Sequence, residues 1–335
     1  MWGKPDSTAI TVIGAGAVGG LIGGKMALAG ADVTLIDQGE QLTALTERGL
    51  TLVHRDGEQS IIDDITVAAT HREQHHTPDI LVVGVKAYDL AAIAPTVSRI
   101  SGPRTTVLPV QNGIPWWYFY EFGGEFEGHR MATLDPDGTV TEHIDIDQVV
   151  GCVPFVAGTV SQPGIVRHDE GEWFPVGELD GAETDRVNGI ADLFEQAGLR
   201  SRVLDDVRSE LWLKELGNLA FNPISALTGA TLESICRNPQ TRALARRMMT
   251  EAKPVAEELG VEFRRSIEDR IDGAEAVGAH KTSMLQDIER GNPLETDALL
   301  GSVIELADLT DCSVPTIESV YGLVSLLEET QTNHD

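Results

Sequence analysis

The stretch TAITVIGAGAVG (residues 8–19) joins a buried-strand pattern to a glycine-rich turn. The apolar run that ends at Gly14 is typical of a strand buried on both faces, and the small residues 17–29 predict a helix. A second apolar run, DVTLID (32–37), follows and ends in a carboxylate. Strand, glycine turn, helix and second strand together predict the opening βαβ unit of a Rossmann-type sheet.

The turn has the spacing of a dinucleotide-binding site. Gly14 permits the tight turn, Gly16 removes a side chain where a pyrophosphate would approach, and Gly19 lets helix and sheet pack closely. Asp37, 21 residues after Gly16, can accept hydrogen bonds from a ribose. We expect an NAD(P) site here, the alternative being a glycine-rich turn without a ligand. The expected cofactor residues are Gly14, Ala15, Gly16, Ala17, Val18, Gly19 and Asp37.

The alternation of strands and helices continues and predicts an α/β fold with a doubly wound parallel sheet. Expected strands are 78–86, 105–113 and one near 149–156, and expected helices are 40–48, 89–100 (interrupted at Pro95) and 184–197. Residues 199–206 are expected to return to the sheet. From residue 207 the pattern is helical, with a break expected at Pro223. The chain is too long for one core, so we expect a Rossmann domain over 1–205 and an all-helical domain over 206–335.

Composition excludes several classes of protein. The net charge of −28 repels nucleic acids and anionic membranes, so neither is expected as a partner. No apolar run is long enough for a membrane span and no signal pattern opens the chain, so we expect a cytoplasmic protein. We expect no metal site. The three cysteines do not have the paired spacing of zinc ligands. His71, His75 and His76 lie close together in the sequence, but no cysteine or carboxylate is placed to complete a set of ligands with them.

The segment LWLKELGNLAFNPISALTG (211–229) places Lys214, Asn218 and Asn222 four residues apart, which makes one stripe on a helix. Asn222 precedes Pro223, which is expected to kink or end the helix. A lysine with two amides suits a small polar substrate, because amides offer donors and acceptors without charge. An ordinary solvated helix face is the alternative.

A third polar group lies in HKTSMLQDIERGNPLETDALL (280–300), where Ser283 and Glu295 flank a turn at Gly291-Asn-Pro293. The alternative interpretation is a capped helix–turn–helix without chemistry. Three interpretations of the aromatic stretch 116–120 remain open, namely a substrate lid, a dimer contact and ordinary packing.

Together with Asn112 in PVQNG and Lys86 in GVKAYDL, these segments resemble the ketopantoate (2-dehydropantoate) reductase family over about residues 8–328. The lysine–asparagine stripe combined with SMLQD is the most specific part of the resemblance. It implies that Lys214 donates the proton to the keto oxygen and that Glu295 lies beside nicotinamide and substrate. Asn112 would lie near both as well. The residues implied to hold the hydroxyl and carboxylate groups of the substrate are Asn218, Asn222 and Ser283.

The resemblance also implies cofactor contacts by Lys86, near the adenosine, and by the backbone of Ala157. Asp37 stands where members that use NADPH carry an arginine or similar group for the 2′-phosphate. A carboxylate there favours NADH over NADPH, because it would repel a phosphate.

The implied activity is NAD(P)H-dependent reduction of a small anionic 2-keto acid, namely ketopantoate to (R)-pantoate in pantothenate biosynthesis, by a homodimer. An NAD-dependent D-2-hydroxyacid dehydrogenase on the same scaffold is the first alternative. A non-catalytic dinucleotide sensor is the second, although a sensor would have no use for the proton donor Lys214.

Overall fold

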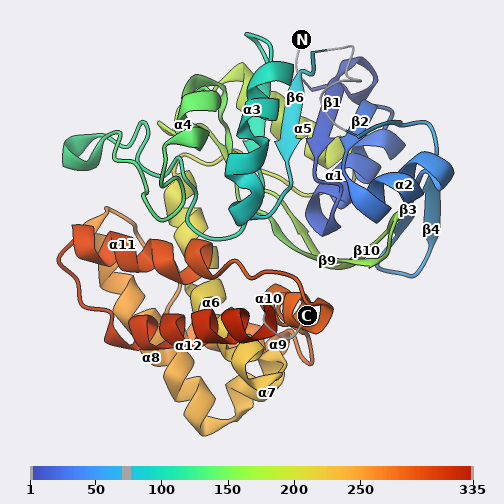
Figure 1. Cartoon of the computed structure of the whole chain (residues 1–335). Helices are drawn as coiled ribbons and strands as arrows, with labels where there is room; N and C mark the ends of the chain where they lie inside the picture. The colour runs from blue at the N-terminus through green and yellow to red at the C-terminus, as the bar shows by residue number, and fades with distance from the viewer. Residues whose placement is uncertain (1–2, 70–76, 333–335) are drawn as a thin grey trace. The chain divides into compact units, whose positions relative to one another are not determined.

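The computed structural model describes residues 3–69 and 77–332, which fold into two compact units (Figure 1). The first unit comprises Met1–Gln111, Phe119–Arg130 and Gly138–Val207, and it is termed the cofactor unit because the predicted glycine turn lies in it. The second unit comprises Asn112–Tyr118, Met131–Asp137 and Arg208–Asp335, and it is termed the substrate unit because the predicted substrate residues lie in it. Two short segments from the N-terminal half of the sequence, one of which begins at Asn112, therefore belong to the substrate unit.

A five-stranded sheet forms the centre of the cofactor unit, and its order is β5-β2-β1-β6-β7. All neighbouring strands are parallel, so the predicted doubly wound sheet is confirmed. The chain reverses its direction of winding between β1 and β6, which is where ligands bind in such sheets. The strands are β1 (Ala9–Ile13), β2 (Asp32–Ile36), β5 (Thr66–Ala68), β6 (Ile80–Val83) and β7 (Thr106–Pro109).

A second sheet of four strands, ordered β4-β3-β10-β9, completes the cofactor unit. Its strands are β3 (Leu50–Val53), β4 (Gln59–Ile62), β9 (Phe155–Gln162) and β10 (Ile165–Trp173), and β8 (Gly151–Cys152) pairs separately with β11 (Val176–Gly177). The α-helices of this unit are α1 (Ala17–Leu28), α2 (Gly39–Arg48), α3 (Leu90–Ile100), α4 (Thr139–His143) and α5 (Asp185–Gln196). The short 3-10 turns are η1 (Pro5–Ser7), η2 (Ala87–Asp89), η3 (Gly124–Phe126) and η4 (Ile146–Gln148).

Helix α1 packs against both sheets, and its glycines allow this close approach. A Cβ atom at Gly23 would lie 2.8 Å from the side chain of Leu35 in β2. A Cβ atom at Gly20 would lie 2.8 Å from the side chain of Val166 in β10. The paired glycines of VGGLIGG thus lie on two opposite faces of α1 and allow each face to pack closely against a sheet. This packing explains why the helix is rich in glycine, a residue that otherwise disfavours helix formation.

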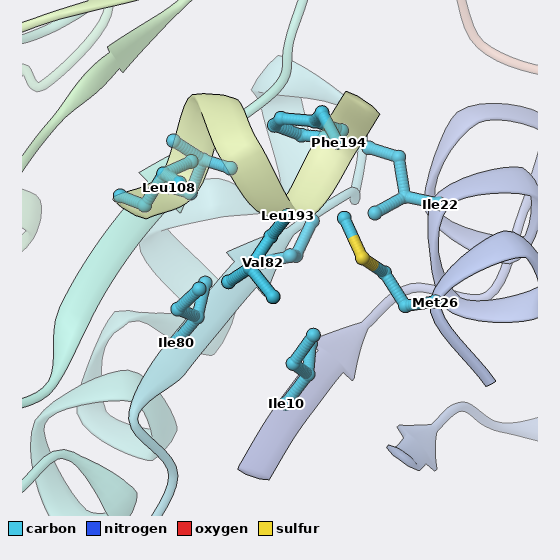
Figure 2. Close-up of a pocket in the computed structure, with 9 residues that line it drawn as sticks. Ile10, Ile22, Met26, Ile80, Val82, Leu108, Leu193 and Phe194 are labelled. Atoms are coloured by element: carbon cyan, nitrogen blue, oxygen red, sulfur yellow. The ribbon is translucent and has the colours of Figure 1, made fainter. Parts of the chain in front are cut away.

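A small cavity remains between the five-stranded sheet and helices α1 and α5 (Figure 2). Only apolar side chains line it, so it offers no partner for a polar ligand and is a packing gap. The lining residues are Ile10, Ile22, Met26, Ile80, Val82, Leu108, Ile190, Leu193 and Phe194.

The described part of the substrate unit contains helices and loops but no strand, so the predicted all-helical C-terminal region is confirmed. No helix among the described residues is long and apolar enough to cross a membrane. The helices are α6 (Val207–Thr228), α7 (Leu232–Arg237), α8 (Pro239–Glu258), α9 (Ile267–Ala276), α10 (Ser283–Arg290), a π-helical turn η5 (Asp297–Gly301), α11 (Ser302–Leu309) and α12 (Pro315–Thr332).

Three local predictions are wrong. Helix α3 continues through Pro95, because the proline faces solvent while the opposite face is buried. Helix α6 continues through Pro223, whose neighbour Ile224 is 1% exposed; packing there outweighs the lost hydrogen bond. Residues 199–206 form single bridges to Trp173 and Val176 and do not join the five-stranded sheet.

Candidate active site

The glycine turn of the cofactor unit has the shape that a pyrophosphate requires. Gly14 has a φ of +87°, and a Cβ there would lie 2.8 Å from the backbone nitrogen of Val85. Gly16 is the N-cap residue of α1, where no side chain caps the helix and a Cβ would meet no atom within 4 Å. The start of α1 therefore has no side-chain cap and has free space beside Gly16, and both features suit the binding of a phosphate group.

Asp37 lies directly after β2 and is bonded to the glycine turn. Its Oδ2 accepts a hydrogen bond from the Ala15 N–H at 2.7 Å, and its Oδ1 accepts one from the Gln38 N–H at 2.8 Å. Burial raises the pKa of the Asp37 carboxyl, and these two N–H groups oppose the shift. Each carboxylate oxygen has a second lone pair, so both remain able to accept bonds from ribose hydroxyls.

The two remaining cofactor candidates also lie in this unit. Lys86 is half-buried and precedes the 3-10 turn η2, directly after the loop that leaves β6. Ala157 lies in β9, and its neighbour Gly158 packs on the first turn of α1, where a Cβ would lie 3.3 Å from the oxygen of Ala17. The structure thus places Ala157 beside the start of α1.

A chain of hydrogen bonds joins three predicted site residues of the substrate unit. Nζ of Lys214 in α6 donates to Oδ1 of Asn112 at 2.8 Å. Nδ2 of Asn112 donates to Oε2 of Glu295 at 3.5 Å, a long bond. Glu295 is 5% exposed and Lys214 is half-buried. The amide thus binds the ammonium through its oxygen and the carboxylate through its nitrogen, and it orients both.

Two contacts that the sequence did not predict hold the hydrogen-bonded residues Asn112 and Glu295 in place. Gly113, with a φ of +85°, packs so closely on η5 that a Cβ would lie 2.2 Å from the oxygen of Ala298. Glu328 in α12 accepts hydrogen bonds from the Leu294 N–H at 2.8 Å and the Thr296 hydroxyl at 3.1 Å. Glu295 is therefore fixed from both sides, next to a π-helical turn of the kind often found at functional sites.

The rest of the predicted stripe lies on the same helix. Nδ2 of Asn222 donates to Oγ of Ser283, the first residue of α10, at 3.5 Å. Asn222 is 6% exposed, whereas Asn218 and Ser283 are half-buried. The structure thus gathers the predicted catalytic and substrate residues in one unit, although they come from distant parts of the sequence.

Four of the five side chains in the aromatic stretch 116–120 are buried. Trp116, Trp117, Tyr118 and Phe119 are each at most 3% exposed. Within the substrate unit, the hydroxyl of Tyr118 accepts a hydrogen bond from Nε1 of Trp212 at 2.8 Å. Buried side chains of this kind cannot serve as a mobile lid.

Within residues 3–69 and 77–332, no three His, Cys, Asp or Glu side chains lie together in a way that could hold a metal ion. The histidines weighed from the sequence, His71, His75 and His76, lie outside the described residues. Burial raises the pKa of the Cys236 thiol to about 11, which makes it a poor nucleophile and metal ligand.

Comparison with known proteins finds similar proteins over most of the chain. The family model described as ketopantoate reductase PanE/ApbA matches residues 10–181, and the model for its C-terminal part matches residues 206–328. A 2-dehydropantoate 2-reductase of Mesorhizobium japonicum is 45% identical over 319 residues, which cover 95% of this chain and 97% of that protein.

Solved structures share the fold over nearly the whole chain. A PanE/ApbA family ketopantoate reductase from Ralstonia eutropha is 26% identical, with a TM-score of 0.82 and coverage of 97% of this chain and 99% of that one. A D-mandelate dehydrogenase with NADH and anilino(oxo)acetate also has a TM-score of 0.82, with the same coverage. It is 18% identical, so this likeness shows the fold alone.

Proposed function

The chain belongs to the ketopantoate reductase family, and from this premise we propose that it reduces 2-dehydropantoate to pantoate with a nicotinamide cofactor. The observation that carries the proposal is the hydrogen-bonded chain of Lys214, Asn112 and Glu295, which joins a proton donor to a carboxylate through one amide. The glycine turn supports the cofactor, because its positive-φ Gly14, the open space at Gly16 and the uncapped start of α1 fit a dinucleotide.

The side chains of the substrate unit supply the rest of the chemistry. When bound, the reduced nicotinamide supplies the hydride for the keto carbon. Lys214 stabilises the negative charge that grows on the keto oxygen and then transfers a proton from Nζ to that oxygen. Asn112 holds Nζ in one direction through its 2.8 Å bond, so the ammonium is positioned before substrate arrives.

Local donors must bind the substrate carboxylate, because a protein with a net charge of −28 repels anions at long range. Asn222 and Ser283 are neutral groups whose N–H and O–H bonds suit this role. We also propose that the enzyme is a homodimer, since twofold symmetric dimers are the commonest oligomers of soluble proteins.

Substrate assays test the proposed function directly. Purified protein should reduce 2-dehydropantoate with a kcat/KM at least about tenfold above that for pyruvate, phenylglyoxylate and 2-oxoisovalerate, a difference of about 1.4 kcal/mol. The measurement is loss of nicotinamide absorbance with NADH and NADPH in parallel. A preference for phenylglyoxylate would instead support the D-2-hydroxyacid dehydrogenase alternative, and no turnover of any 2-keto acid would support the sensor.

The position of Asp37 leads us to propose NADH as the preferred cofactor. A 2′-phosphate beside this partly buried carboxylate would be repelled, with Lys86 as the nearby cation that softens the effect. We expect kcat/KM to favour NADH by about ten- to a hundredfold, or about 1.4–2.8 kcal/mol. Asp37→Asn keeps the size and one acceptor oxygen but removes the charge, so the preference should shrink to within about threefold.

Asp32→Asn is the matched control, because Asp32 is an exposed carboxylate at the other end of β2. Its cofactor preference should equal that of the parent. An unmodified enzyme that uses NADPH as well as NADH would show that Asp37 does not select the cofactor.

A further inference from the structure

Arg270 in helix α9 of the substrate unit is an arginine without a counter-ion. Its side chain is half-buried, and its Nε is buried without a hydrogen-bond partner. Nη1 and Nη2 keep some exposed surface, but within residues 3–69 and 77–332 they form no hydrogen bond or ion pair. A partly buried charge without a partner costs stability. It is also unexpected in a chain that has 53 acidic side chains against 25 lysines and arginines.

The four acids of α9 are all engaged elsewhere. Three of them form ion pairs with Arg242 of α8 at 2.5–3.4 Å, namely Glu268, Asp272 and Glu275. The fourth, Asp269, accepts hydrogen bonds from the backbone N–H and the hydroxyl of Ser266, where α9 begins. Residues two apart on a helix point to different sides, so Arg270 points away from the acids that face α8.

Helix α6 leaves room for the guanidinium of Arg270 at Gly217. A Cβ atom there would lie 3.2 Å from Cζ of Arg270 and closer still to Nη2. Glycine weakens a helix relative to alanine, and the space that the guanidinium occupies explains its presence here. Gly217 lies five residues before Asn222, which is about 140° around the helix. The guanidinium is therefore on a different side of α6 from Asn222, to which we assign the substrate carboxylate.

The charge around Arg270 is positive. Burial lowers the pKa of its guanidinium, and nearby Arg265 lowers this pKa further. Both side chains stay charged at neutral pH, because the ordinary pKa of arginine lies above about 12. An anion that reaches this place meets two cations, although the whole chain carries a net charge of −28.

We propose that Arg270, with Arg265 nearby, binds a small oxyanion, namely a carboxylate or a phosphate group, beside Gly217 of α6. The planar guanidinium offers parallel N–H donors that match two oxygens of such a group. The anion supplies the counter-charge that the chain does not provide, so its binding stabilises the folded protein. This site is separate from the proposed substrate residues and does not depend on the proposed function.

Thermal unfolding of the full chain, without cofactor or substrate, tests the site. Sodium phosphate at about 20 mM, with the ionic strength held constant by sodium chloride, should raise the Tm by about 2–4 °C. Arg270→Met keeps the apolar stem and removes the charge, so the shift should fall below about 1 °C. Without added anion, the Tm of this variant should equal or exceed that of the parent, because no uncompensated charge remains. Sodium acetate in parallel identifies the ligand class: a shift with both anions assigns a carboxylate, and a shift with phosphate alone assigns a phosphate group.

Gly217→Ala is a second variant, because its Cβ must displace the guanidinium, and it should also lose the anion-dependent shift. Gly273→Ala is the matched control, since it adds the same methyl group to α9 where no neighbouring atom lies within 4 Å. Arg247→Met removes an exposed arginine of α8 and controls for net charge. Both controls should keep the parental shift. If Arg270→Met keeps the shift, the anion binds elsewhere, and if neither anion shifts the Tm of the parent, there is no such site; either result overturns the inference.

Discussion

Replacement of Lys214 by methionine should lower kcat by about two to four powers of ten, the usual contribution of a positioned general acid. Methionine keeps the length and apolar stem of lysine, so the packing of α6 should survive. The hydrogen bond from Nζ to Asn112 is lost, and with it both the proton and the positive charge at the keto oxygen. Steady-state kinetics with saturating cofactor and 2-dehydropantoate measure the effect.

Lys281→Met is the control for this substitution. Lys281 is an exposed residue of the same unit, and its ammonium pairs with the Glu289 carboxylate at 2.5 Å. Its kcat should stay within about twofold of the parent, because exposed ion pairs contribute little. Cofactor binding, followed by quenching of protein fluorescence, should be unchanged in both variants. If the Lys214 variant turned over within threefold of the parent, the proton would have to come from another group.

Replacement of Gly19 by alanine should damage both stability and cofactor binding. The added Cβ would lie 2.1 Å from the oxygen of Gly14 and 3.1 Å from the side chain of Val12. The first contact is with backbone, so the glycine turn must move. Overpacking of this kind costs about 1–3 kcal/mol or more. We expect a lower Tm and a Kd for NADH raised by at least about a hundredfold, or about 2.8 kcal/mol.

Gly16→Ala separates the two effects. A Cβ at Gly16 meets no protein atom, and its φ of −75° is ordinary, so the Tm without cofactor should stay within about 1 °C of the parent. The same methyl group occupies the space where a pyrophosphate would approach, so the Kd for NADH should still rise by at least about tenfold. Unchanged affinity in this variant would place the pyrophosphate away from the turn. Calorimetry for Tm and titration for Kd are the two measurements.

The sequence alone predicted those parts of the fold whose signals are local. The buried strands β1 and β2, the glycine turn between them and the first turn of α1 were predicted within a residue or two of their observed bounds. Strands β3 and β4 of the second sheet were not predicted, because each has only four residues and at most half of its side chains are buried. The dipeptide Asp56-Gly57 between them was a hairpin signal that could have revealed this pair.

The site was predictable only in part. Lys214 and Asn112 are 102 residues apart, so no spacing rule brings them together, and only the resemblance to a family suggested their proximity. Glu328 had no signal, because an acid on a helix is unremarkable in a chain with 53 acidic residues. Its role depends on contacts with Leu294 and Thr296, which lie more than 30 residues earlier in the sequence. The expected break at Pro223 failed for a related reason, since a local rule was overridden by packing on both sides of the proline.

The position of α1 between two sheets has a consequence for the order of folding. Each glycine in a helix interior weakens it by about 0.5–1 kcal/mol relative to alanine, so α1 is a poor helix in isolation and cannot nucleate. It can form only when the strands on both sides are in place, and one of these sheets uses β10, more than 130 residues further along the chain. Its contacts should thus be absent from the folding transition state. A dinucleotide that binds the first turn of α1 would then slow the unfolding of the protein and leave its rate of folding unchanged.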